Sequence, residues 1–257
     1  STQRRIGNLI KKALESEEEG KMLYEKAQDI LMRMIKFKSF KKNKSTKIVN
    51  LGNLRQMKRA DAEFFLFKND YKDKMEMVML GKIAKISRGI EVGRGEYTHS
   101  GKLFLRASNI DKFGLIDKSQ KFISSKLYEK LSRKYQPEIG DILFVKDGKP
   151  GVACLIREPL TGIISESIVR VVVDRSVSAE YVFLCINSPF CQEQILIDRD
   201  GSLQPHLKVD RIEELKIPIV GEDVQEEISK LIKDSYVKFD GSKEYLKEAI
   251  DLFSMIY

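Results

Sequence analysis

Two glycine-rich segments are the first candidates for chemistry, because backbone amides in such loops can bind phosphate groups. Residues 88–95 contain Gly89, Gly93 and Gly95, but not at the GxGxxG spacing of a dinucleotide-binding loop. The pair Gly148-Lys149 has no glycine five residues earlier and is not followed by Ser or Thr, so it is not a Walker A motif. The Asp147-Gly148 pair between two apolar runs instead predicts the tip of a β-hairpin.

Carboxylates offer a second kind of chemistry. Asp141 and Asp147 resemble part of a nuclease metal site, but both lie on one short hairpin, and the sequence places no third carboxylate beside them. The chain has no Asn/Asp-Pro-Pro-aromatic tetrapeptide for methylating a base, and no Ser or Cys in a nucleophile elbow. The sequence therefore predicts a protein that is not an enzyme.

Metal ligands are also scarce. The two histidines, His99 and His206, lie far apart in the sequence. The three cysteines, Cys154, Cys185 and Cys191, are odd in number and have no CxxC spacing. This pattern predicts buried, reduced thiols in a cytoplasmic protein, with no metal and no cofactor.

The 257 residues are 42% hydrophobic, which is enough for one large domain or two small ones. No apolar run approaches the roughly 20 residues that span a bilayer, and the polar start suggests no signal peptide. The chain begins Ser-Thr without Met, so we expect a processed product or an excised segment.

The net charge of +8 is distributed unevenly. Residues 36–60 carry nine Lys or Arg and no acid, whereas residues 76–175 hold 18 basic and 12 acidic side chains, an excess of six positive charges. Residues 176–257 hold 9 basic and 16 acidic side chains, an excess of seven negative charges. A basic first half suits a polyanion such as nucleic acid, although a solvated linker at 36–49 would account for part of it equally well.

The first 31 residues return in diverged form near the end of the chain. With an offset of 222, residues 3–31 match residues 225–253 at 8 of 29 positions. Both copies have apolar residues three and four positions apart, which predicts two related helices that bracket a globular insert. The acidic run 15–19 with Gly20, and Asp240-Gly241-Ser242, predict a kink or break in each helix, and Asp223 is the expected N-cap of the second.

Each predicted helix has an apolar stripe that needs a partner. The two stripes could pair within one chain or between two copies, and we hypothesise a dimer that places two globular domains at opposite ends of a spacer. The residues expected in this pairing are Leu9, Ile10, Ala13, Leu23, Ala27, Ile30, Leu231, Ile232, Ser235, Leu246, Ala249 and Ile250.

Between the helices the hydrophobic period changes from helical to short-strand spacing. Strands are predicted near 103–106, 141–145, 152–156, 163–164, 167–173 and 215–220, and residues 77–86 are expected to form an apolar strand or a short turn of helix. Helices are predicted at 125–135 and 179–197. The expected fold is α+β: a domain of many short strands flanked by two long related helices that form an antiparallel coiled-coil-like spacer. The predicted division is 1–36 (helix), 37–75 (basic linker), 76–220 (globular domain) and 221–257 (helix).

Six segments in order resemble the DNA-specificity (S) subunit of type I restriction-modification systems, specifically one target-recognition domain with its flanking spacer helices. Each segment is weakly specific alone, but their order and the repeated helix make the resemblance strong. The segments are 59–65, 78–89 with 97–110, 140–143 with 148–151, 201–207, 215–218 and Gln225. The family often carries two recognition domains per chain, whereas this sequence holds one. A half-size subunit, part of a longer subunit and the recognition region of a fused methyltransferase all remain open.

The resemblance implies a non-catalytic prokaryotic subunit that binds one half of a split DNA target and docks adenine methyltransferase and restriction subunits. Lys and Arg would contact phosphates and loop side chains would contact bases. Glu166 and Arg170 are interpreted as structural partners. The alternatives are a fused type II restriction-methyltransferase and a coiled-coil scaffold that binds protein or RNA. The expected DNA contacts are Arg88, Arg94, Tyr97, His99, Lys102, Arg106, Asn109, Lys146, Lys149, Ser202, Gln204 and His206.

Overall fold

The fold is seen in a computed structural model that describes residues 2–36, 51–52, 75–198 and 205–255. The chain divides into two compact units, one formed by Ser1–Met34 with Gly221–Tyr257 and the other by Ile35–Val220. Most of the predicted basic linker at 37–75 lies outside the described residues.

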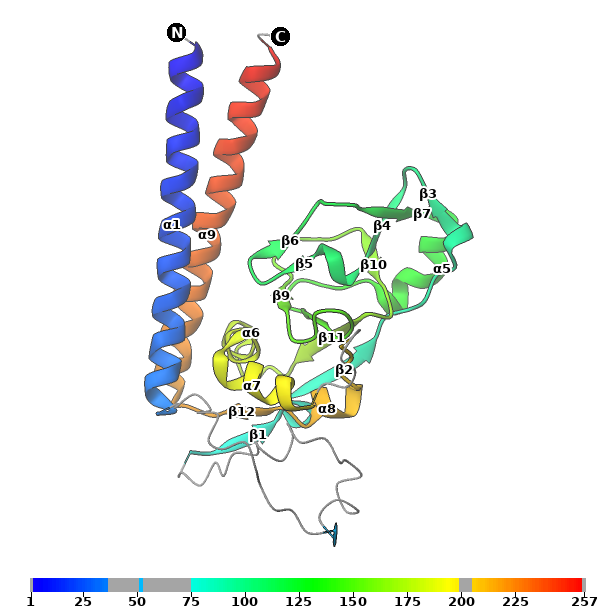
Figure 1. The fold of residues 1–257 in the computed structure, drawn as a ribbon, viewed down its shortest axis with the longest axis vertical. Helices are drawn as coiled ribbons and strands as arrows, with labels where there is room; N and C mark the ends of the chain where they lie inside the picture. The colour runs from blue at the N-terminus through cyan, green and yellow to red at the C-terminus, as the bar shows by residue number, and fades with distance from the viewer. Residues whose placement is uncertain (1, 37–50, 53–74, 199–204, 256–257) are drawn as a thin grey trace. The chain divides into compact units, whose positions relative to one another are not determined.

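The first unit is a helical hairpin of α1 (Thr2–Met34) and α9 (Glu222–Ser254). The helices run antiparallel, because Arg5 pairs with Glu248 and Glu19 pairs with Lys238. Figure 1 shows them side by side, separating towards the two ends of the chain. The two stripes therefore pair within one chain. Buried residues that form the seam include Leu9, Ala13, Ala27, Ile30, Leu231, Ile232, Ser235 and Ala249.

Both helices are continuous, so neither copy has the break that the sequence suggested. Gly20 lies inside α1 because α9 approaches it closely: a Cβ atom there would lie 3.0 Å from the backbone oxygen of Ser235. The Ser235 hydroxyl donates a 2.7 Å hydrogen bond to the Gly20 carbonyl. Gly20, which in the sequence suggests a break in the helix, is thus the residue that allows α1 and α9 to pack closely.

The start of α9 also differs from the prediction. The N-cap is Gly221, and no side chain caps the helix, so Asp223 lies in the first turn. Its carboxylate remains close to the helix N-terminus, where negative charge is favourable.

The second unit contains two four-stranded sheets (Figure 1). One has the order β2-β11-β8-β9 and is antiparallel throughout, with β2 at Ala84–Arg88, β11 at Ile168–Val173, β8 at Ile142–Val145 and β9 at Ala153–Leu155. The other has the order β10-β4-β7-β3, with β10 at Gly162–Ile164, β4 at Lys102–Leu105, β7 at Lys121–Ile123 and β3 at Tyr97–Thr98. Only its β10–β4 pair is parallel.

Smaller elements complete this unit. Two-stranded sheets join β1 (Met77–Met79) to β12 (Lys216–Pro218) and β5 (Ile110–Asp111) to β6 (Gly114–Leu115). The helices are α4 (Leu80–Ile83), α5 (Ser125–Tyr135), α6 (Ala179–Asn187), α7 (Pro189–Asp198) and α8 (Val209–Glu213), with 3-10 turns η1 (Arg94–Glu96) and η2 (Ala107–Asn109). The helix predicted at 179–197 is two helices, because Ser188 has extended backbone angles and Pro189 begins the next helix.

Strands β4 and β10 separate two hydrophobic clusters. Phe104 and Ile163 pack in one with the apolar residues of α5, whereas their neighbours Leu105 and Ile164 pack in the other with β8 and β9. Successive strand residues point to opposite faces, so burial on both faces accounts for the continuous apolar runs in these strands. The mixed α+β fold with long terminal helices confirms the predicted fold class. No helix in the described ranges has the length and hydropathy that a bilayer span needs.

The three cysteines are buried thiols that form no disulfide bond, as their spacing predicts. Burial raises the pKa of the Cys185 thiol to about 12, so it is protonated at neutral pH and inert as a nucleophile.

Candidate nucleic-acid interface

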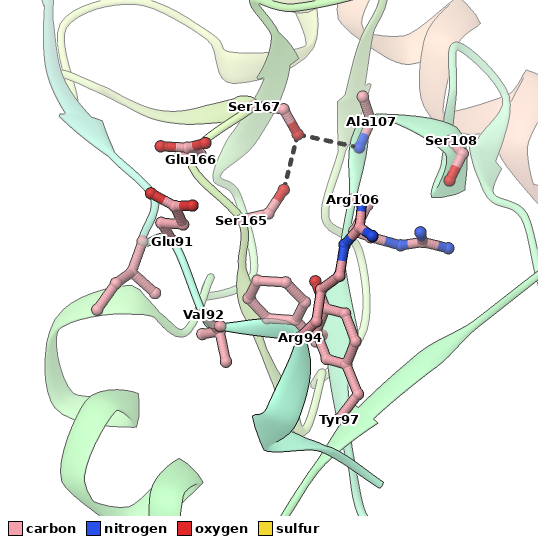
Figure 2. A pocket seen from close by; sticks show the side chains of 13 residues that line it. Glu91, Val92, Arg94, Tyr97, Arg106, Ala107, Ser108, Ser165, Glu166 and Ser167 are labelled. Atoms are coloured by element: carbon pink, nitrogen blue, oxygen red, sulfur yellow. Dashed lines mark hydrogen bonds between the residues drawn. The ribbon is translucent and has the colours of Figure 1, made fainter. Parts of the chain in front are cut away.

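An open pocket of about 410 Å³ brings together residues that are far apart in the sequence (Figure 2). It is built where residues 89–91 run beside residues 164–166. Ile90 donates a hydrogen bond to the Ile164 carbonyl at 3.0 Å and accepts one from the Glu166 amide, also at 3.0 Å. Gly89 makes this contact possible, because a Cβ atom there would lie 2.1 Å from the Ser165 carbonyl oxygen. Gly89 is therefore needed for close packing of these two segments, whereas a Cβ atom at Gly93 or Gly95 would meet nothing within 4 Å.

Serine hydroxyls connect this wall of the pocket to the next. The hydroxyls of Ser165 and Ser167 lie 2.7 Å apart, and the Ser167 oxygen accepts a hydrogen bond from the Ala107 amide at 3.3 Å. The rings of Tyr97 and Phe104, with centroids 5.7 Å apart, provide an aromatic surface inside the pocket. Rings of this kind give rigid apolar contact area with little loss of side-chain entropy.

Arg94, Tyr97 and Arg106 are the predicted DNA contacts that line this pocket. Arg94 is exposed at the start of η1, and its side chain has no ion pair within the described part of the chain. Arg106 is more constrained, because its Nη2 atom donates to the Ser119 carbonyl at 2.5 Å. Its buried Nε–H has no hydrogen-bond acceptor among the described residues.

Asn109 has a structural role instead. It is 2% exposed, and its side chain accepts from the Arg106 amide and donates to the carbonyls of Ile116 and Lys118 at 3.0–3.2 Å. These bonds hold the 106–118 loop in place. Asn109 therefore leaves the set of proposed DNA contacts.

Three other predicted contacts do not line the pocket. Arg88 ends β2 and His99 lies between β3 and β4, and both are exposed. The Lys102 ammonium lies 5.7 Å from the ring centroid of Tyr128. Lys121, which the sequence did not single out, lies 5.9 Å from the ring centroid of Tyr97. Lysine ammonium groups thus lie near the rings of Tyr97 in β3 and Tyr128 in α5.

Three further predicted contacts, Lys146, Lys149 and His206, lie together at the β8–β9 hairpin. The antiparallel pairing of β8 with β9 confirms the predicted tip at Asp147-Gly148. Asp147 forms ion pairs with Lys146 and His206, and Gly148 donates a hydrogen bond to the Pro205 carbonyl at 2.9 Å. Lys146 is thus an internal partner of Asp147, with a side chain only 13% exposed.

Lys149 is exposed at the tip of the same hairpin. The predicted contacts Ser202 and Gln204 lie outside the described residues.

Asp141 belongs to the scaffold and not to a nuclease site. Its carboxylate lies 2.5 Å from Nε of Arg170 and accepts a hydrogen bond from the Glu138 amide. Burial raises the pKa of Asp141 above its ordinary value, and the Glu138 amide and the Arg170 guanidinium partly offset that rise. The structural assignment of Arg170 is therefore correct. Within the described ranges, no group of three or more His, Cys, Asp or Glu is arranged to hold a metal ion.

The sequence did not predict that two acidic residues, Glu91 and Glu166, line the pocket. Glu91 was not singled out, and Glu166 was assigned a structural partnership that the structure does not bear out. Within the described residues neither carboxylate has a hydrogen bond or ion pair. A usable signal lay in residues 163–168, where Glu166 is the one charged residue in an otherwise apolar and serine run.

The chain thus combines an α+β domain that carries an open pocket with an antiparallel helical hairpin. Residues 72–250 match the model of the type I restriction modification DNA specificity domain. The chain therefore belongs to that family, whose members are non-catalytic DNA-recognition components, in agreement with the sequence prediction. A search of curated proteins finds no significant match.

A solved structure shows the same fold. The type I restriction-modification S subunit from M. genitalium is 14% identical with a TM-score of 0.55, and the match covers 99% of this chain and 55% of that one. The HsdS subunit from Thermoanaerobacter tengcongensis is 13% identical with a TM-score of 0.48, covering 98% of this chain and 57% of that one. The chain thus spans little more than half the length of these subunits.

Proposed function

We propose that this chain recognises duplex DNA, as the specificity component of a restriction-modification system that binds one half of a split target. The observation that carries the proposal is the pocket lined by residues 90–94, 97, 104, 106–108 and 165–167, with the exposed Arg94 among them, in a domain of a DNA-specificity family. Exposed Arg and Lys side chains contact phosphates, and pocket side chains contact base edges.

Binding of a labelled random duplex by the whole chain tests this proposal across a range of salt concentrations. We expect affinity to fall steeply with salt, and Arg94→Ala and Lys149→Ala each to lower the slope of log K against log salt by about 0.9, as one lost phosphate contact predicts. Lys26→Ala in α1 is the matched control and should leave the slope unchanged. Binding that does not respond to salt, or to either substitution, contradicts the proposal and favours the protein or RNA scaffold.

The helical hairpin is the proposed docking surface for adenine methyltransferase and restriction subunits. Pairing within the chain already buries most of the predicted stripe, so the seam residues cannot also join two copies. Large apolar side chains that stay 41–64% exposed on the hairpin include Ile10, Leu14, Leu246 and Ile250. Exposed apolar side chains of this size on a charged hairpin suit a partner helix.

A dimer of two copies through the same exposed residues is the competing arrangement, and it would present an inverted, symmetric split target. Sedimentation equilibrium of wild type and Ile250→Asp, with and without the methyltransferase, separates the two. A wild type that dimerises at micromolar concentration and is made monomeric by Ile250→Asp supports the dimer. A monomer that binds the methyltransferase through Ile250 supports docking. A chain that does neither contradicts both.

The cellular setting follows from the proposed function, which places the protein in the prokaryotic cytoplasm beside a methyltransferase. A fused type II restriction-methyltransferase remains the alternative assembly. Methyltransferase motifs in the same reading frame, upstream of Ser1, would favour it.

A further inference from the structure

We propose that one exposed face of helix α5 binds the sugar-phosphate backbone of duplex DNA, whatever the base sequence. This inference rests on the proposed DNA-recognition function and assigns to it a second contact surface. None of the DNA contacts expected from the sequence lies on α5. The surface, called the α5 basic face below, consists of Lys126, Lys130, Arg133 and Lys134.

Helix α5 separates its apolar and basic side chains onto different faces. The apolar face is partly buried against a cluster of Val92 with residues of β4, β7 and β10, and it consists of Leu127, Tyr128, Leu131 and Tyr135. The four cations recur at spacings of four, three and one, so they fall within an arc of roughly 100° on the helix. All four are exposed, and α5 has no exposed large apolar side chain. The α5 basic face therefore offers a partner positive charge without apolar contact.

The cations of this face are not neutralised within the protein. None of the four forms an ion pair with a carboxylate in the part of the chain that the structure describes, and neither does Glu129, the one acid of the helix. The helical hairpin differs, because there Lys21 pairs with Glu17 and Lys238 pairs with Glu19. Four positive charges against one negative charge leave α5 an excess of three positive charges.

Helix stability does not account for this pattern of charge. The first turn of α5 has no acidic residue, and Lys126 lies there, near the partial positive charge of the helix N-terminus. Arg133 and Lys134 do suit the last turn, and the Lys134 ammonium also lies 5.2 Å from the ring centroid of Tyr135. A face that is positive along its whole length is expected where a bound partner supplies the negative charge.

The density of charge on this face matches that of a DNA strand. Lys126 and Lys134 are separated by about 12 Å along the helix, so the face carries about one positive charge every 3–4 Å. Each strand of B-DNA carries one negative charge per roughly 3.4 Å of its axis. Long, flexible lysine side chains can reach successive phosphates without a fixed geometry.

Two lysines of the adjoining sheet extend the positive charge from α5 towards the pocket. The Lys102 ammonium in β4 lies 5.7 Å from the ring centroid of Tyr128 in α5. The Lys121 ammonium in β7 lies 5.9 Å from the ring centroid of Tyr97, which lines the pocket with Arg94. Figure 1 shows α5 beside the sheet that contains β4 and β7. A backbone bound along α5 would therefore lead towards the pocket.

Duplex binding by the whole chain tests the α5 basic face, with the triple variant Lys126→Ala, Lys130→Ala and Arg133→Ala. Alanine favours helix, so these exposed substitutions should leave α5 folded, which circular dichroism and thermal unfolding check. Each lost phosphate contact lowers the slope of log K against log salt by about 0.9, so three should lower it by about 2.7. The motif selected from a random duplex library should stay that of the wild type, because phosphate contacts do not read bases.

Two triple variants serve as controls, and both should keep the wild-type slope. One retains the three charges of the face through Lys126→Arg, Lys130→Arg and Arg133→Lys. The other removes three exposed lysines from α4, β2 and β12 of the same unit, through Lys82→Ala, Lys85→Ala and Lys216→Ala. A lower slope in either control would contradict the assignment of phosphate contacts to the charges of the α5 basic face.

The remaining outcomes separate this inference from the proposed function. A triple alanine variant with the wild-type slope, beside an Arg94→Ala variant that lowers it, overturns the α5 basic face and leaves DNA recognition standing. An altered motif at an unchanged slope overturns phosphate binding in favour of base contact. Lost binding to phosphatidylserine vesicles, with duplex binding unchanged, overturns it in favour of a membrane surface. A wild type that binds no duplex at low salt overturns the proposed function, and this inference with it.

Discussion

The two units of this chain are held together in different ways. The helical hairpin repeats one kind of contact along two helices of 33 residues each, with small or apolar side chains in the seam and ion pairs such as Arg5–Glu248 at its edge. The α+β unit instead joins strands of two to six residues from distant parts of the chain. Because the hairpin repeats the same kind of contact many times, it can tolerate changes in its sequence. The pocket of the α+β unit depends instead on a few individual contacts.

The internal repeat places small, buried residues at equivalent positions of α1 and α9. Gly20 and Ser242 are equivalent positions of the two copies, as are Ala13 and Ser235. All four are small and buried, and Gly20 meets Ser235 directly. In an antiparallel pair of related helices, small residues at equivalent positions let the two backbones approach each other. The same repeated pattern of small residues therefore accounts for the close packing of both helices.

The largest predicted effect lies in the α+β unit. Asp141→Ala should lower the free energy of unfolding by about 3–5 kcal/mol, because it leaves the partly buried Arg170 guanidinium without its closest carboxylate. Urea unfolding followed by circular dichroism measures the change. Glu138→Ala is the control, since that carboxylate is 76% exposed and 3.5 Å from Arg170, and should cost less than about 1 kcal/mol. Equal effects of the two substitutions would contradict the assignment.

The next effect concerns the seam of the hairpin. Leu9→Asp should destabilise α1 and α9 by about 2–4 kcal/mol, because it places a carboxylate in a buried apolar site. Leu14→Asp, on the same helix but 62% exposed, should cost less than about 0.5 kcal/mol. Hydrogen exchange resolved by residue is the measurement, since faster exchange should be confined to the hairpin. Matching losses in the sheets of the α+β unit would show that the two units do not behave as separate structures.

Substitutions of two glycines in α1 should change the stability of the hairpin by a smaller amount. Gly7→Ala should stabilise the hairpin by up to about 1 kcal/mol, because a Cβ atom there meets nothing within 4 Å and alanine favours helix. Gly20→Ala gains the same propensity but meets the Ser235 carbonyl at 3.0 Å, so it should lose that advantage or reverse it. Thermal unfolding of both variants measures the difference. A Gly20→Ala variant as stable as Gly7→Ala would show that the helices can move apart without cost.

The smallest effect is expected at the edge of the hairpin. Arg5→Ala removes the ion pair with Glu248, whose side chains are 65% and 45% exposed, and should cost less than about 0.5 kcal/mol. Unfolding at low and high salt measures it, and any loss should shrink at high salt. A loss comparable with that of Leu9→Asp would mean that edge charges and not the buried seam hold the helices together.

The sequence alone determined the parts of this protein that depend on local pattern. Apolar spacing and the repeat predicted both long helices, and Asp147-Gly148 predicted the β8–β9 hairpin, because these features involve residues close together in the chain or copied from one another. The family resemblance and the basic charge likewise came from the order and type of residues. Arg94, Tyr97 and Arg106, three of the predicted DNA contacts, line the same pocket.

Tertiary structure decided what each polar side chain does. Asn109 and Lys146 were predicted to contact DNA, but internal partners up to nine residues away in the chain engage them. Glu91 and Glu166 are 75 residues apart in the sequence, and only the close approach of Gly89 to Ser165 brings them to one pocket. Pairing of the helices within one chain was equally undecided, since an apolar stripe specifies that it must be buried and not what buries it. Local sequence thus determines where the helices and strands form, and tertiary packing determines which residues their side chains contact.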